Sequence, residues 1–173
     1  MGAKGHRMTR LARARSDETS TKDIDTFRQF LEAGRPGPHA YVVLLGLHSY
    51  DLPDLLRHVR NGLPYKSFER FLRNLSLPAD QAMEFIDIPR RTMVRRKREG
   101  RLQPDESDRL LRASRVFARA LELFEGDREA AVHWLTSPIV ALGGARPIDL
   151  ARTEVGAREV EREIGRAEDG VYS

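Results

Sequence analysis

The chain of 173 residues contains no cysteine, which excludes disulfide bonds, cysteine-based zinc sites and a thiol nucleophile. Its longest apolar run, Tyr41–Leu47, is far shorter than the roughly 20 residues that a membrane-spanning helix needs. No apolar stretch follows the cationic first residues, so a secretory signal is not indicated. The five histidines are scattered, and no glycine-rich phosphate-binding loop is present. We therefore expect a cytoplasmic protein that is not an enzyme, binds no membrane and needs no metal or cofactor.

Charge is distributed unevenly along the chain. The net charge is +4, but residues 1–104 carry 20 basic and 12 acidic side chains, a balance of +8. The remaining residues, 105–173, carry 10 basic and 14 acidic side chains, a balance of −4. A basic half joined to an acidic half suggests two surfaces with different partners.

The beginning of the chain gives the weakest signals. Residues 1–22 have no sustained apolar period, which predicts a flexible basic tail or a basic arm that becomes ordered along nucleic acid. Residues 23–62 are predicted to be an N-terminal helical and dimerisation segment. Within it, Tyr41–Leu47 is expected to be a buried strand or a short core helix, and its pattern also suggests a dimer seam. Asp23 and Ser67 are predicted N-caps of two helices.

The middle of the chain, residues 63–103, has the layout of a helix-turn-helix domain. A predicted helix over Ala79–Ile86 is followed by a tight turn and a strongly basic helix over Arg90–Glu99, which Gly100 ends. Asp87 stands where such turns usually have glycine, and aspartate tolerates the left-handed conformation better than most residues.

The basic helix carries the sharpest chemical signal in the sequence. Between Arg90 and Arg101 there are seven cations and one anion, which would repel one another without an anionic partner. Arginine can pair with guanine through two hydrogen bonds, and other cations bind phosphates through counterion release. The predicted DNA-binding residues are Arg90, Arg91, Thr92, Arg95, Arg96 and Lys97. A solvated helix face whose charge run is coincidental, or docking on an acidic protein, remains the alternative.

The acidic half, residues 104–173, is predicted to be a small helical unit. Pro104-Asp105-Glu106 begins a helix with acids in its first turn, which the helix dipole favours. Thr153 is expected to cap the last helix and Gly170 to end it. A stripe of four arginines along the first of these helices is either solvated or contacts a partner; its members are Arg109, Arg112, Arg115 and Arg119.

Many short motifs, taken in their order and spacing, resemble the Xre/MbcA/ParS-like antitoxins with their C-terminal toxin-binding domain. The resemblance covers residues 60–173. The motifs are Ile88-Pro89-Arg90-Arg91-Thr92, Arg95-Arg96-Lys97, Gly100-Arg101-Leu102, Glu106-Ser107-Asp108-Arg109-Leu110, Trp134-Leu135, Pro138, Ala141-Leu142-Gly143-Gly144, Pro147, Leu150, Thr153-Glu154 with Gly156, and Gly170-Val171-Tyr172-Ser173.

The resemblance implies an all-α protein with an Xre-like helix-turn-helix domain followed by a small helical toxin-binding domain. It implies a homodimer that binds operator DNA and represses its own operon. It also implies a RES-domain toxin as partner, which consumes NAD or transfers ADP-ribose from it. The chain's end then occludes the toxin's NAD site, with Gly170, Val171, Tyr172 and Ser173 as toxin-binding residues. A plain helix-turn-helix transcriptional regulator with no toxin partner is the alternative.

Overall fold

The computed structural model describes residues 18 and 22–170, and these residues are almost all helix, 3-10 helix or short connection. Within them there is no strand, and one isolated bridge pairs Pro64 with Arg101. The all-α prediction is confirmed. The predicted tail over residues 1–22, apart from Glu18 and Lys22, lies outside the described residues, and so do Val171, Tyr172 and Ser173.

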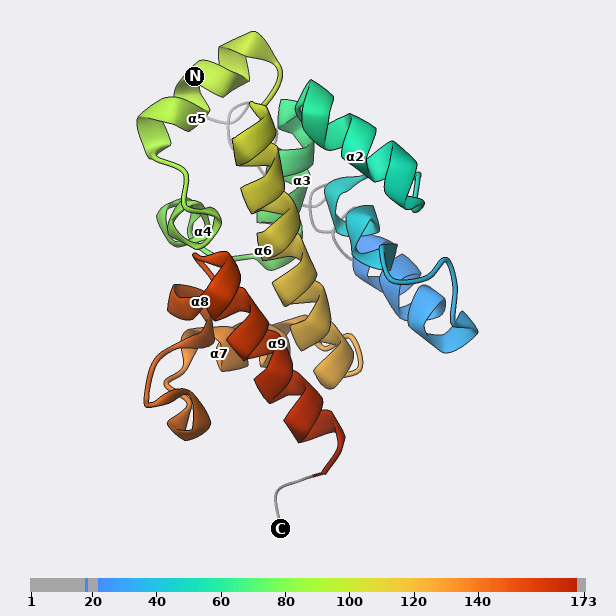
Figure 1. Cartoon of the computed structure of the whole chain (residues 1–173), viewed down its shortest axis with the longest axis vertical. Helices are drawn as coiled ribbons and strands as arrows, with labels where there is room; N and C mark the ends of the chain where they lie inside the picture. The colour runs from blue at the N-terminus through green and yellow to red at the C-terminus, as the bar shows by residue number, and fades with distance from the viewer. Residues whose placement is uncertain (1–17, 19–21, 171–173) are drawn as a thin grey trace, which may run out of the picture.

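The helices follow one another with short connections (Figure 1). A helix over residues 22–33 comes first. It is followed by the 3-10 helix η1 (Ala40–Leu45), α2 (Leu52–Asn61), α3 (Tyr65–Leu75), α4 (Ala79–Ile86), α5 (Arg90–Glu99), α6 (Pro104–Leu123), α7 (Arg128–Thr136), the 3-10 helix η2 (Val140–Leu142), α8 (Pro147–Leu150) and α9 (Glu154–Glu168).

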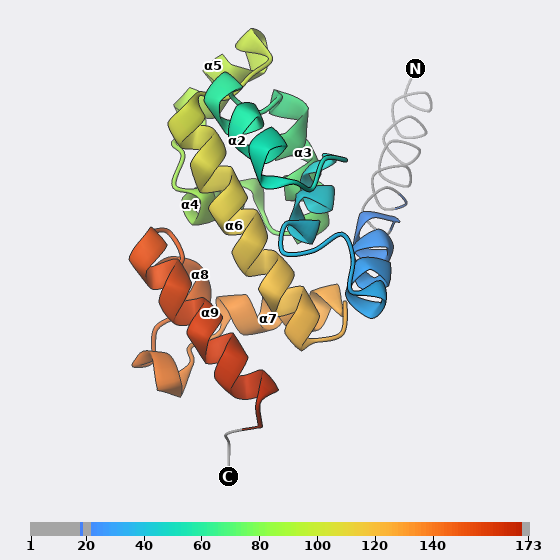
Figure 2. The same ribbon diagram turned by 45° about the vertical axis from the view of Figure 1, so that its right-hand side comes forward.

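Helix α6 is the central element of the fold. Figures 1 and 2 show it running through the middle of the molecule, with α5 near one of its ends and α7 and α9 beside the other half. It contacts α2, α3, α4, α7, α9 and η1. Phe117 of α6 is fully buried and packs edge-on against Phe71 of α3, which also contacts Phe85 of α4. One core therefore joins the basic and the acidic halves.

The apolar run Tyr41–Leu47 is a short core helix, one of the two forms that the sequence suggested. Every residue of η1 is buried, and Val42 and Leu44 have no exposed surface. Asn74 donates a hydrogen bond to the Leu44 carbonyl at 2.8 Å. The predicted dimer seam at this segment is wrong, because the run is apolar on all sides and the chain's own helices cover it.

Two predicted helix caps are also wrong. Asp23 lies inside the helix over residues 22–33, where its buried carboxylate accepts hydrogen bonds from Arg70 and Asn74. Ser67 is buried within α3, whose N-cap is Pro64. The fixed backbone of proline already suits a helix start, and the bridge between Pro64 and Arg101 sets the direction in which α3 begins.

Candidate nucleic-acid interface and toxin-binding region

The turn between α4 and α5 has the predicted conformation. Asp87 is left-handed, with φ of 61°, and its amide donates to the Glu84 carbonyl at 3.0 Å. The next amide, of Ile88, donates to the Met83 carbonyl at 3.0 Å. Met83, Ile88 and Met93 are all buried, so α4 and α5 are fixed to one core. The predicted bounds of both helices are confirmed.

Helix α5 lies at one end of the molecule (Figure 1). Most of its cations are exposed. The exposed ones are Arg90, Arg91, Arg95, Lys97 and Arg98, while Thr92 is half-buried. Arg90 contacts Asp80 at 3.2 Å, but both side chains are more than two-thirds exposed. Such surface ion pairs contribute about 0–1 kcal/mol to stability. A phosphate can therefore take the place of Asp80 beside Arg90.

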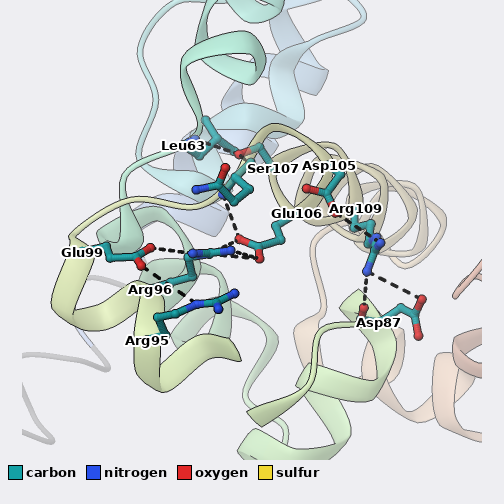
Figure 3. Close-up of polar contacts among 10 residues, drawn as sticks. Leu63, Asp87, Arg95, Arg96, Glu99, Asp105, Glu106, Ser107 and Arg109 are labelled. Carbon is teal, nitrogen blue, oxygen red and sulfur yellow. Dashed lines mark hydrogen bonds and ion pairs between the residues drawn. The ribbon is translucent and has the colours of Figure 1, made fainter. Parts of the chain in front are cut away.

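Arg96 does not belong to this exposed set, and its predicted role in DNA binding is wrong. The residue is 6% exposed. Its Nε donates to both carboxylate oxygens of Glu106, at 2.7 and 3.0 Å, and its Nη2 donates to the same group at 2.9 Å (Figure 3). Its Nη1 donates to Glu99 at 2.5 Å. Arg96 follows Met93 by three residues, and this spacing places both side chains on the inward face of α5.

Glu106 connects this buried arginine to the start of α6. Its carboxylate also accepts from the Gln103 amide at 2.8 Å, which completes a capping box. Burial alone would raise the pKa of the Glu106 carboxyl, but the hydrogen bonds from Arg96 and Gln103 outweigh it and hold the pKa below its usual value. The pair therefore fixes α5 against α6 as a charged, fully hydrogen-bonded unit.

The turn between α4 and α5 is also bonded to the acidic half. Arg109 of α6 donates to the Asp87 carbonyl at 2.8 Å and contacts Asp105 at 3.3 Å (Figure 3). Arg152, in the connection between α8 and α9, donates to the Asp87 carboxylate at 3.2 Å. The turn that orients α5 is thus held by a residue of α6 and by a residue of the connection between α8 and α9.

The four-arginine stripe of α6 makes contacts within the chain itself, a role that the sequence did not suggest. The contacts of Arg109 are given above. Arg112 is buried and donates to the carbonyls of Ala151 and Arg152 at 3.1 and 2.5 Å. Arg115 contacts Glu161 and Glu154 of α9, and Arg119 contacts Glu168 near the end of α9. These contacts fasten α8 and α9 to the central helix.

The last helix begins as predicted and ends close to the predicted residue. The Thr153 hydroxyl accepts from the Gly156 amide at 3.1 Å, so Thr153 is the N-cap of α9. Helix α9 ends at Glu168, and Gly170 follows it, exposed and left-handed with φ of 67°. Gly170 is the one predicted toxin-binding residue within the described part of the chain.

Val94 and Arg98 are exposed on α5, although neither is one of the residues predicted to bind DNA. Val94 is 58% exposed, although it stands between the buried Met93 and the cations of the same helix. Met93 is the apolar residue of α5 that faces the core. A second apolar residue directly after it, on so polar a helix, could have been recognised in the sequence as an exposed residue.

Two further observations concern the whole described region. Among residues 18 and 22–170, no three metal-ligating side chains come together. In the same region, every helix is too short or too polar to cross a bilayer.

Two family models match consecutive regions of the chain. Residues 54–115 match the antitoxin Xre-like helix-turn-helix domain. Residues 119–170 match the antitoxin Xre/MbcA/ParS C-terminal toxin-binding domain. The two matched regions meet within α6.

Curated proteins show the same relationship. Antitoxin Xre of Yersinia enterocolitica is 42% identical over 99 residues, which cover 57% of this chain and 67% of the relative. Antitoxin Xre of Photorhabdus laumondii is 32% identical over 130 residues, which cover 75% and 88%. A Sphingobium protein named Prs ADP-ribosylating antitoxin is 27% identical over 131 residues, which cover 69% and 81%.

Proposed function

Since the chain belongs to the Xre family of antitoxins, we propose that it neutralises a RES-domain toxin by occluding the toxin's active site, and that it binds DNA as a dimer to repress its own operon. Residues 63–103 are the DNA-binding domain in this proposal, and residues 104–173 hold the toxin. Residues 23–62, apart from the buried run Tyr41–Leu47, serve the dimer. The name of the Sphingobium relative refers to ADP-ribosylation, which is the chemistry of an enzyme that uses NAD.

The exposed cations of α5 are the observation that carries the DNA-binding part of the proposal. Arg91, Thr92 and Arg95 lie within the first six residues of α5 after the turn, where a recognition helix meets base edges. Arg90 and Lys97 are exposed on the same helix and are assigned to phosphates. Val94, exposed among them, suits an apolar contact with a thymine methyl group.

Replacing Arg91 and Arg95 together by alanine should lower the affinity for the chain's own promoter at least about 30-fold, because each arginine contact to a base is worth about 1–3 kcal/mol and about 1.4 kcal/mol is a factor of ten. The measurement is fluorescence anisotropy with a promoter duplex between 50 and 200 mM salt, where the wild-type affinity should fall steeply. The matched control replaces Arg158 and Arg162, two exposed arginines of α9. Equal losses for both pairs, or a flat salt response of the wild type, would contradict the assignment.

The end of the chain carries the toxin-binding part of the proposal. Val171, Tyr172 and Ser173 follow Gly170, which is exposed and left-handed just after α9. A tyrosine ring supplies a large contact area at low entropic cost.

Deleting Val171–Ser173 should restore the toxin's NAD-dependent activity in the purified complex, because the proposed plug leaves the active site while the rest of the domain still binds. The measurement combines an assay of NAD consumption with size-exclusion chromatography of the complex formed with the product of the adjacent toxin gene. Operator binding is the control and should be unchanged. A truncated chain that still suppresses the toxin completely would refute the plug.

A further inference from the structure

An apolar loop projects from the toxin-binding region. Residues 138–145, between α7 and α8, contain no charged side chain, although 32% of the whole chain is charged. Val140 is 93% exposed and Ala141 is also exposed. Val140 and Ala141 are adjacent, so the tip of the loop presents a small contiguous apolar surface that a protein partner can cover.

The loop is held in one conformation by its own backbone. The Ile139 amide donates to the Ala145 carbonyl at 3.1 Å, and the Gly144 amide donates back to the Ile139 carbonyl at 3.0 Å. The Gly143 amide donates to the Val140 carbonyl at 2.9 Å. Both glycines have positive φ, of 68° and 79°, so the reversal of the chain needs no strain. Val140 is therefore presented outward on a preorganised turn, which reduces the entropy lost on binding.

The base of the loop is anchored in the fold. Leu142 packs against the core, and Pro147 and Ile148, which follow the loop, are buried. In Figures 1 and 2 the loop lies toward the lower end of the molecule, as does the C-terminal end of α9, while α5 lies at the upper end. A partner that seats on the loop can thus also meet the C-terminal end of α9, and it leaves α5 free.

We propose that this loop is a second contact with the toxin, in which Val140 enters an apolar depression on the toxin surface beside the pocket that the chain's end blocks. The inference rests on the proposed function. The toxin is favoured as occupant because the loop lies inside the region matched to the toxin-binding domain and at the same end of the molecule as the C-terminal end of α9. An outward valine on a rigid support has the character of a binding anchor.

The test replaces Val140 by aspartate in the full chain and measures affinity for the product of the adjacent toxin gene by biolayer interferometry. We expect the affinity to fall about 10- to 100-fold, since the contact loses the burial of one valine and gains an unpaired charge. The matched control is Val155→Asp. Val155 is 75% exposed in the first turn of α9, where an acid is compatible with the helix dipole. This variant should keep wild-type affinity.

The remaining measurements separate the possible failures. The melting temperature and operator affinity of both variants should equal those of the wild type, because both valines are exposed. A wild-type chain that does not bind the toxin would refute the proposed function itself. Wild-type affinity in Val140→Asp, or an equal loss in Val155→Asp, would overturn the assignment to the loop alone. If Val140→Asp keeps its toxin affinity but light scattering gives it a different molecular mass from the wild type, the loop makes contacts between copies of this chain. That result would also overturn the assignment to the toxin.

Discussion

Replacing Arg96 by alanine should lower the free energy of unfolding by about 3–5 kcal/mol and abolish operator binding, although Arg96 itself faces the core. The substitution removes one partner of a buried ion pair and leaves the Glu106 carboxylate, which is 5% exposed, without the charge that balances it. The same substitution at Arg95, whose side chain is 56% exposed and 3.9 Å from Glu99, should change stability by less than about 0.5 kcal/mol.

Urea denaturation followed by circular dichroism measures this difference in stability. A double variant tests whether the loss comes from the broken ion pair. Arg96→Met combined with Glu106→Leu replaces the pair with apolar side chains of similar length, and such replacements are often neutral. The double variant should recover most of the lost stability and the operator affinity as well. A double variant that is stable but does not bind DNA would show that Arg96 acts on DNA directly, against its buried position.

The pair also predicts how stability depends on pH. The folded-state pKa of Glu106 is lowered, so its contribution is fully present above the carboxyl's usual pKa and is lost as pH falls through the lower, folded value. The stability difference between the wild type and Glu106→Gln should therefore be constant near neutral pH and shrink under acid conditions. Denaturation curves measured from pH 7 down to pH 3 check this, and a difference that grows in acid would contradict it.

The sequence was sufficient for the parts of the fold that local chemistry determines. Proline before each helix, with a residue suited to the left-handed conformation after it, predicted the bounds of α4 and α5 as the structure has them. The left-handed Asp87 followed from the same local pattern. These features depend on neighbours within a few residues, so a single sequence contains the information.

The errors concern residues whose partners are distant. Arg96 was predicted to bind DNA like the neighbouring cations, because its charge alone does not reveal that it meets Glu106 on the next helix. Asp23 is a buried acceptor for Arg70, 47 residues away, so no local pattern could replace the predicted cap. Tyr41–Leu47 is apolar on every side, and its burial depends on helices that cover it from both halves of the chain.

The predictions for the candidate site show the same difference between local features and distant partners. The exposed cations of α5 follow from sequence, since five of the six residues predicted for DNA remain accessible or half-buried. The bonds that hold the turn at Asp87 do not, because Arg109 and Arg152 reach it from elements 22 and 65 residues away. The projecting loop could have been noticed as an uncharged stretch, but only the structure shows that Val140 points into solvent.

Gly156→Ala should be the most damaging small substitution in the toxin-binding region, with a loss of about 3 kcal/mol. A Cβ at this position would lie 1.9 Å from the Leu150 carbonyl oxygen, which is backbone and cannot move without displacing the connection between α8 and α9. That connection presents the carbonyls of Ala151 and Arg152 to the buried Arg112. Any displacement therefore also removes the acceptors of a buried cation, which adds to the steric cost.

The control for this prediction lies on the same helix. A Cβ added at Gly165 of α9 would meet no neighbouring atom within 4 Å, so Gly165→Ala should stabilise the protein by about 0.5–1 kcal/mol through helix propensity. Thermal denaturation of the two variants should move in opposite directions, and toxin affinity should fall only for Gly156→Ala. Equal behaviour would mean that the start of α9 tolerates displacement, and the link through Arg112 between the central helix and the toxin-binding region would then have to be abandoned.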